Sequence, residues 1–378
     1  MKIGIVCYPT FGGSGVVATE LGMALADKEH EVHFITYNQP VRLDFFSHRL
    51  HFHEVMLEEY PLFQYQPYEL ALSSKMVEVV EKYQLEVLHV HYAIPHAYAA
   101  YMAKKMLFDK GINVKVVTTL HGTDITLVGS HPTYKTAVEF SINKSDEVTA
   151  VSQSLKDDTL RLFNIDKDIK VVYNFIDGEK YNKAHQTECQ RSALANENER
   201  ILTHISNFRP VKRTDDVIKI FNKVQKEIPS KLLMVGDEPE RIKAEKLVDK
   251  LGLKSKVLFL GNSNEVAKIL CYTDVFLLPS ETESFGLAAL EAMAASTVVV
   301  STNSGGLPEV NIHNKTGFLS NVGDVDDMAK NAIYVLKDDV VLNKFKVNAK
   351  KHIELFSLDY VLPQYEKIYK KCYIESEK

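Results

Sequence analysis

The sequence predicts an α/β protein made of two doubly wound, Rossmann-like domains. Its 378 residues exceed the roughly 250 to 300 at which a single hydrophobic core stops growing. Short β-branched runs alternate with longer amphipathic stretches, which is typical of βαβ units around a parallel sheet. A polar segment, residues 177–199, separates two such series. Each series therefore predicts one domain.

The first series alternates strands and helices from residue 3 to residue 172. The expected strands are Ile3–Cys7, Val32–Thr36, Val87–His91, Val114–Leu120, Glu147–Val151 and Ile169–Val172. The expected helices are Gly15–Lys28, Tyr68–Tyr83, Pro95–Leu107, Tyr134–Asn143 and Ser152–Phe163. β-Branched residues favour strands, and apolar residues at helical spacing favour amphipathic helices.

The second series predicts another parallel sheet. Its expected strands are Ile201–Ser206, Lys231–Val235, Val257–Leu260, Val275–Leu278 and Val298–Ser301. We place the boundary within residues 173–182, which gives domains of residues 1–173 and 174–357. The two halves repeat an architecture and share no motif.

Composition narrows the classes of function. The net charge of -5 with mixed signs gives no basic field for nucleic acid. The four cysteines lack metal-ligand or disulfide-framework spacing, so we expect reduced thiols and a cytoplasmic protein. No apolar run reaches about 18 residues, so no membrane span is expected. The apolar start, Ile3–Cys7, is too short for a signal peptide.

Ligands of open α/β sheets bind beyond the carboxyl ends of the strands. If two such sheets face each other, the natural site is the cleft between them. The polar motifs of this sequence all follow predicted strands, and we therefore assign them to one site.

A glycine-rich loop, Tyr8–Gly15, joins the first strand to the first helix. Glycines allow close backbone approach to a ligand, and free N–H groups at a helix start favour a negative oxygen. The spacing of Gly12, Gly13 and Gly15 does not fit the dinucleotide fingerprint G-x-G-x-x-G. A purely structural turn is the alternative interpretation.

His121 follows another strand and is accompanied by Gly122, Thr123 and Asp124. Its ring can hydrogen-bond a substrate hydroxyl, and its backbone carbonyl can face a developing positive charge. A structural histidine is the alternative. The earlier histidines 89, 91 and 96 are weaker candidates, and we expect no metal site among these residues.

Two further motifs lie in the second half. Ser206–Arg213 places three cations in five positions after a strand, which favours a diphosphate over a merely solvated face. Glu283 and Glu291 are eight residues apart and flank Gly286. Carboxylates accept paired hydrogen bonds from sugar diols, and the apolar neighbours of Glu291 indicate that it needs a partner.

These motifs together resemble those of the family-4 glycosyltransferases of the GT-B fold, over nearly the whole chain. The Glu283–Glu291 pair matches the family's E-x7-E motif, accompanied by Gly12-Gly13 and by Ser304–Glu309. The phrases Cys7–Gly22, Leu88–His96, Thr118–Thr126 and Ile205–Arg213 are most similar to the subgroup that begins bacillithiol biosynthesis.

The resemblance implies a retaining transferase that moves N-acetylglucosamine from UDP-N-acetylglucosamine (UDP-GlcNAc) to L-malate, with no metal and no cofactor. It implies an N-terminal acceptor domain and a C-terminal nucleotide-sugar domain, with residues 358–378 returning to the first. The amphipathic stretch Leu358–Glu375 suits that return. The partners are small molecules, and a homo-oligomer stays open.

The resemblance also implies roles in the donor site. Glu291 holds the ribose, and Glu283 holds sugar hydroxyls together with the backbone of Ser284, Phe285 and Gly286. Arg209 and Lys212 hold the diphosphate. Many family members carry G-R-x-x-x-x-K-G here; this chain has Asn207 at the usual Arg place and Arg213 at the last Gly, so Arg209 is the inferred substitute.

On the acceptor side, Gly13 and His121 would flank the transferring sugar, and Ser14, Tyr92 and Thr123 would contact malate. The expected catalytic residues are His121, Arg209, Lys212 and Glu283. Domain closure would exclude water from this site. Three alternatives remain: a family-4 transferase with another acceptor, such as an inositol phosphate or a lipid-linked sugar; a nucleotide-sugar epimerase; and a noncatalytic nucleotide-binding protein.

Overall fold

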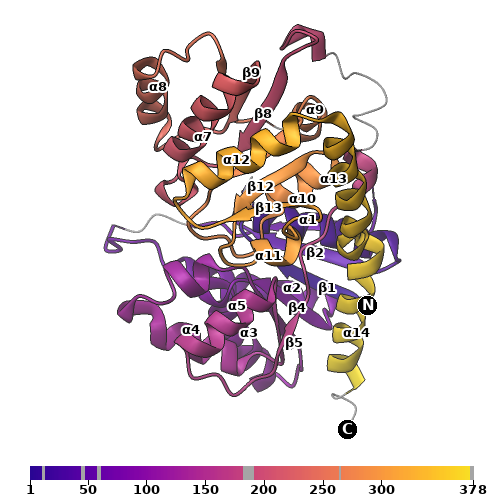
Figure 1. Ribbon diagram of the computed structural model, residues 1–378. Coiled ribbons are helices and arrows are strands. Elements are labelled where there is room, and N and C mark those ends of the chain that lie inside the picture. The colour runs from indigo at the N-terminus through magenta and orange to yellow at the C-terminus, as the bar shows by residue number, and fades with distance from the viewer. Residues whose placement is uncertain (11–12, 44–46, 58–60, 182–190, 264, 375–378) are drawn as a thin grey trace. The chain divides into compact units, whose positions relative to one another are not determined.

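The computed structural model describes residues 1–10, 13–43, 47–57, 61–181, 191–263 and 265–374 (Figure 1). The chain divides into two compact units. The first contains Met1–Phe175 and Leu358–Lys378, and the second contains Ile176–Ser357. The chain therefore enters the second unit once and returns from it once.

The first unit is built on a seven-stranded parallel sheet in the order β3-β2-β1-β4-β5-β6-β7. The strands are β1 (Lys2–Val6), β2 (Glu31–Thr36), β3 (Leu50–Glu54), β4 (Val87–His91), β5 (Lys115–Leu120), β6 (Glu147–Ala150) and β7 (Ile169–Val171). All six predicted strands are confirmed within one or two residues. The edge strand β3 was not predicted.

The helices of the first unit follow the predicted pattern. They are α1 (Gly13–Asp27), α2 (Tyr68–Tyr83), α3 (Tyr98–Asp109), α4 (Pro132–Lys144), α5 (Gln153–Leu162) and α14 (Leu358–Ile374). The predicted helix at Pro95 is wrong in its first turn, which is a π-helical turn, Ala93–Ala97. Ile94 is extended there, with φ -130° and ψ 142°, because a residue before proline avoids the α region.

Helix α14 brings the end of the chain back into the first unit, where it packs against α1 and β5 (Figure 1). Tyr365 and Tyr369 of this helix are almost fully buried. The Tyr369 hydroxyl is hydrogen-bonded to Nδ1 of His89 at 2.7 Å, and Lys371 forms an ion pair with Glu147 at 2.5 Å. The helix thus supplies part of this unit's core.

The second unit contains a six-stranded parallel sheet in the order β10-β9-β8-β11-β12-β13. The strands are β8 (Arg200–Ile205), β9 (Ser230–Val235), β10 (Val257–Gly261), β11 (Val275–Leu278), β12 (Val298–Thr302) and β13 (Gly317–Ser320). Five were predicted; β13 was not. The helices are α7 (Thr214–Glu227), α8 (Arg241–Lys250), α9 (Val266–Cys271), α10 (Leu287–Ala294), α11 (Leu307–Val310), α12 (Val325–Leu336) and α13 (Asp339–His352).

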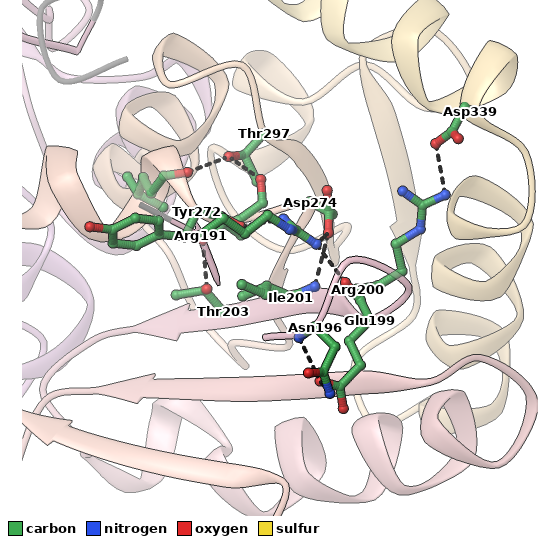
Figure 2. Close-up of polar contacts among 12 residues, drawn as sticks. Arg191, Asn196, Glu199, Arg200, Ile201, Thr203, Tyr272, Asp274, Thr297 and Asp339 are labelled. Carbon is green, nitrogen blue, oxygen red and sulfur yellow. Dashed lines mark hydrogen bonds and ion pairs between the residues drawn. The ribbon is translucent and has the colours of Figure 1, made fainter. Parts of the chain in front are cut away.

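A half-buried polar cluster fixes the start of this second sheet (Figure 2). The Asp274 carboxylate accepts hydrogen bonds from the Arg191 guanidinium at 2.7 Å and from the Ile201 backbone N–H at 2.9 Å. Arg191 also donates to the carbonyl oxygens of Tyr272 and Glu199. The cluster satisfies backbone groups of β8 and of the turn before β11.

The cysteines correct one expectation. Cys7 and Cys372 are free and buried, but Cys271 is disulfide-bonded; Cys189 lies outside the described residues. The expectation of reduced thiols throughout is therefore wrong at Cys271, because spacing along the sequence does not reveal which cysteines a fold brings within bonding distance. Among the described helices, none is long and apolar enough to cross a membrane.

Candidate active site

Both sheets reverse their strand order at one point, and the predicted site residues lie there. In the first unit the reversal falls between β1 and β4, and in the second between β8 and β11. A crevice forms at the carboxyl ends of strands where neighbouring connections leave in opposite directions. Each unit therefore offers one place for a ligand, and each holds one group of predicted residues.

In the first unit the structure brings Ser14 and Tyr92 together. The Ser14 hydroxyl lies 2.6 Å from the Tyr92 hydroxyl, although Ser14 is in the first turn of α1 and Tyr92 follows β4. The Tyr92 ring also contacts His121 and Tyr8, with centroid distances of 5.1 and 5.3 Å. Tyr92 thus lies beside the predicted catalytic histidine, and Ser14 lies beside Tyr92.

Tyr92 has an unusual backbone conformation, with φ 88° and ψ 136°. Such a conformation costs about 1–3 kcal/mol for a residue with a side chain, and surrounding contacts must hold it. One of them is the Tyr92 backbone N–H, which donates to the Thr119 carbonyl at 2.9 Å. In this conformation the Tyr92 hydroxyl meets Ser14.

His121 is nearly buried and neutral. Its Nε2 is hydrogen-bonded to His91 Nδ1 at 2.8 Å, and only 9% of the residue is exposed. Burial lowers the pKa of His121 to about 3. At neutral pH the ring can exchange hydrogen bonds with a hydroxyl but carries no positive charge. Sequence analysis missed His91 as its partner.

Asp124 fixes the loop that carries His121. One carboxylate oxygen accepts from the backbone N–H groups of Gly122 at 2.9 Å and His121 at 3.2 Å. The other accepts from the Ala93 N–H at 2.8 Å and so joins the loops after β4 and β5. Burial raises the pKa of Asp124 to about 6. Thr123, the third predicted acceptor residue, is half-buried at the start of a π-helical turn.

The glycine-rich loop ends where α1 begins, at the exposed Gly13. A β-carbon on Gly15 would lie 2.5 Å from the Tyr8 carbonyl oxygen and 2.6 Å from that of Thr10. Glycine at position 15 therefore permits the first turn of α1 to pack against the loop. Gly12 lies outside the described residues.

In the second unit the structure pairs two predicted catalytic residues. The Lys212 ammonium donates to Oε1 of Glu283 at 2.5 Å. The Ser280 hydroxyl donates to the same oxygen at 2.9 Å. The side chains of Lys212 and Glu283 keep 20% and 14% of their area exposed. Lys212 and Ser280 thus both hold Oε1 of Glu283, and the Lys212–Glu283 pair remains partly exposed to solvent.

The backbone around Glu283 is held by the loop after β12. Gly306 donates its N–H to the Glu283 carbonyl at 2.9 Å. Gly305 has φ 58°, and a β-carbon there would lie 1.9 Å from that carbonyl oxygen. The Glu281 N–H donates to the Val211 carbonyl at 2.8 Å, which joins the Lys212 turn to this loop. The predicted motif of Ser304–Glu309 therefore supports Glu283.

Helix α10 begins at Leu287, so Glu283 lies in the loop before it and Glu291 in its second turn. The eight-residue spacing therefore spans the end of this loop and the start of the helix. Gly286 precedes the helix with φ 100° and lies against Leu307. Phe285 is buried, with its ring 5.7 Å from Phe356, while Ser284 and Glu291 are half-buried.

The other predicted phosphate residues differ in their surroundings. Asn207 and Arg209 are exposed in the loop after β8. Arg213 is bound to Asp216, with Nε 2.7 Å from the carboxylate. Arg209 and Lys212 therefore remain the candidates for binding a diphosphate. Arg213 instead supports the start of α7 through its ion pair with Asp216. Ser280 is a residue that sequence analysis missed, although it lies two residues after the end of β11.

Comparisons with known proteins identify the family of this chain. Residues 11–180 match the family model described as Glycosyltransferase Family 4, and residues 185–352 match the model described as Glycosyl transferases group 1. The chain is 49% identical over 370 residues to the N-acetyl-alpha-D-glucosaminyl L-malate synthase of Bacillus anthracis, covering 98% of this chain and 96% of that protein.

Solved structures show the same fold at low sequence identity. A glycosyltransferase from Rickettsia africae superposes with a TM-score of 0.81 at 22% identity, covering 98% of each chain. HepE of Anabaena, in complex with UDP and glucose, gives 0.81 at 19% identity over 98% of this chain and 99% of that one.

The two parallel-sheet units and these likenesses define an enzyme, a glycosyltransferase of the GT-B fold. The chain belongs to the family-4 glycosyltransferases.

Proposed function

We propose that this enzyme transfers N-acetylglucosamine from UDP-GlcNAc to the hydroxyl of L-malate, the first step of bacillithiol biosynthesis, in the cytoplasm. The observation that carries this proposal is the 49% identity to the Bacillus anthracis N-acetyl-alpha-D-glucosaminyl L-malate synthase over almost the whole of both chains. The arrangement of each unit gives the proposal its chemical detail.

In the proposed complex the second unit binds the donor. Lys212 and Arg209 neutralise the diphosphate, and Glu283 and Glu291 accept hydrogen bonds from sugar and ribose hydroxyls. The Lys212–Glu283 pair supports this assignment because it places a cation beside a carboxylate where the turn after β8 meets the loop after β11, and both side chains are partly exposed. The diphosphate would then bind Lys212, and the sugar hydroxyls would bind the neighbouring Glu283.

The first unit is proposed to bind the acceptor. Malate carries two carboxylates, and the free N–H groups at the start of α1 favour anions. Ser14 lies at this helix start, and its hydroxyl meets that of Tyr92. Neutral His121 would hydrogen-bond a sugar hydroxyl beside them.

The proposed mechanism is front-face transfer with retention and requires no metal. The bond between the anomeric carbon and the UDP oxygen breaks as the malate hydroxyl oxygen bonds to that carbon from the same side. The hydroxyl proton passes to the departing diphosphate oxygen. Glu283 is assigned to hydroxyl binding and already holds Lys212, so no carboxylate nucleophile is invoked. Positioning and stabilisation of the leaving UDP lower the barrier.

The decisive experiment measures UDP release from UDP-GlcNAc with a panel of hydroxy acids and polyols. We expect release that depends on L-malate and a product that keeps the α configuration, read from the anomeric coupling constant. UDP release that occurs only with another acceptor would reject malate as the substrate but would still identify the protein as a transferase. Isomerised donor without acceptor would identify an epimerase, and binding without turnover a noncatalytic protein.

A further inference from the structure

A cluster of potential metal ligands lies at the edge of the first sheet. Glu31 and His33 belong to β2, and His51 belongs to the edge strand β3. Parallel pairing places His33 directly opposite His51. Glu31 Oε1 lies 3.1 Å from His33 Nε2 and 3.7 Å from His51 Nε2. One ligand atom from each of the three residues fits within 4.8 Å of the others.

These separations suit a small cation. In a tetrahedral zinc site with bonds of about 2.0–2.1 Å, neighbouring ligand atoms lie roughly 3.4 Å apart. The two measured separations bracket that value, so small side-chain shifts would let three atoms share one ion. His33 is fully buried, whereas the side chains of His51 and Glu31 are 35% and 33% exposed. The cation can enter from solvent, and water can complete its coordination.

A third histidine, His53, orients the buried ligand His33. His33 Nδ1 is hydrogen-bonded to His53 Nε2 at 2.8 Å, and the ring of Tyr83 packs on both imidazoles. Metal-bound histidines commonly donate their second ring N–H to such an acceptor, which fixes the ring and raises its basicity. His53 therefore occupies the place of a positioning residue, because it can accept the second ring N–H of His33.

Lys2 is the nearest cation, and it approaches the other side of the carboxylate. Its ammonium lies 3.8 Å from Glu31 Oε2 and donates to the Tyr83 carbonyl at 3.0 Å. Oε1 therefore faces the two imidazoles. The rival explanation is a hydrogen-bonded cluster that holds no ion.

We propose that Glu31, His33 and His51 form a binding site for a first-row divalent cation, with Zn²⁺ as the expected ion. Two imidazoles and a carboxylate are ligands that zinc prefers. The ion would tie the edge strand β3 to β2. Glu31 and His51 lie at the amino ends of their strands, whereas the candidate active site lies at the carboxyl ends, so the role is structural.

The test titrates ZnCl₂ into the full chain after treatment with a chelator, by calorimetry, and follows thermal unfolding with and without the ion. We expect one Zn²⁺ per chain and a higher Tm with zinc. His51→Ala and Glu31→Gln should each weaken binding by at least about 100-fold and abolish the rise in Tm, because each removes a ligand. His53→Phe should weaken binding by about 10–100-fold, as loss of an orienting partner does.

His48→Ala is the matched control, since it removes an exposed histidine three residues from His51; it should bind zinc as the natural chain does. Circular dichroism confirms that each variant is folded, and His51→Gln replaces His51→Ala if that variant is not. Equal zinc affinity in the natural chain and in the folded His51 variant, or no binding by the natural chain, would overturn the proposal. Malate-dependent UDP release should persist in His51→Ala, so this site and the proposed function fail independently.

Discussion

The ammonium of Lys212 and Oε1 of Glu283 are 2.5 Å apart. The carboxylate therefore has a cationic partner within its own unit. Both side chains retain some exposure, so the pair is open to a ligand. A diphosphate that binds Lys212 would compete with Glu283 for the ammonium and would leave the carboxylate free to accept from sugar hydroxyls.

Lys212→Ala should lower kcat for malate-dependent UDP release by about 100-fold or more and change the KM for L-malate little. Loss of one group that stabilises charge on a leaving group typically costs that much. Lys223→Ala is the control, because Lys223 pairs with the largely exposed Asp326 on the surface. A Lys212→Ala enzyme with natural kcat would remove Lys212 from the mechanism, and a covalent glycosyl adduct on Glu283 would replace front-face transfer.

Tyr92→Phe should raise the KM for L-malate by about fivefold and leave the KM for UDP-GlcNAc nearly unchanged. The substitution deletes the hydroxyl that meets Ser14, and one lost hydrogen bond is worth about 1 kcal/mol. Steady-state kinetics with each substrate varied in turn separates the two constants. Tyr98→Phe, at a partly exposed tyrosine of α3, controls for hydroxyl loss in general. A change confined to the donor KM would contradict the acceptor assignment.

Asp274→Ala should lower the free energy of unfolding of the second unit by about 3 kcal/mol. It leaves the Arg191 guanidinium and the Ile201 N–H without their shared acceptor (Figure 2), and breaking a largely buried charged pair costs about that much. Asp339→Asn breaks the Arg200 pair at a carboxylate that is 71% exposed, and should cost less than about 1 kcal/mol. Urea unfolding compares the two; similar losses would disprove the role of Asp274.

Acid should destabilise the fold below about pH 6.5. Burial lowers the pKa of His204 to about 4 in the folded chain, against 6.5 for an ordinary histidine. The unfolded chain therefore binds more protons between these values, so stability is complete above pH 6.5 and falls as the pH approaches 4. The same direction holds for His89, His96 and His121.

His204→Gln isolates one such group. Going from pH 7.5 to pH 5 should cost the natural chain about 2 kcal/mol more than the variant, because 1.4 kcal/mol accompanies each pH unit below 6.5. Urea unfolding at both pH values measures the difference. Equal losses in the two proteins would show that protonation of His204 does not destabilise the fold.

The order of strands and helices was predictable because the parallel strands are runs of buried β-branched residues. Strand β3 was missed because its sequence, Leu50–Glu54, carries two histidines. These become half-buried only when β2 supplies His33 beside them and α2 supplies Tyr83. The stability of β3 therefore depends on contacts with β2 and α2, which the local sequence pattern does not reveal.

The candidate site was predictable to the level of loops, since its residues follow strands and carry charge or glycine. Which of them touch depends on distances that the sequence does not contain. The hydrogen bond from Ser280 to Glu283 and the bond between His91 and His121 depend on side-chain rotamers and on how neighbouring strands align. The Ser14–Tyr92 contact depends further on the positive φ of Tyr92.

Because α14 belongs to the first unit, the two units become complete in a fixed order during translation. The second unit is one uninterrupted segment, residues 176–357, so all of it leaves the ribosome before the last helix does. The N-terminal unit, although synthesised first, lacks Tyr365 and Tyr369 from its interior until the segment that follows the second unit has been made. Folding of the N-terminal unit can therefore be completed only after the whole second unit has been synthesised.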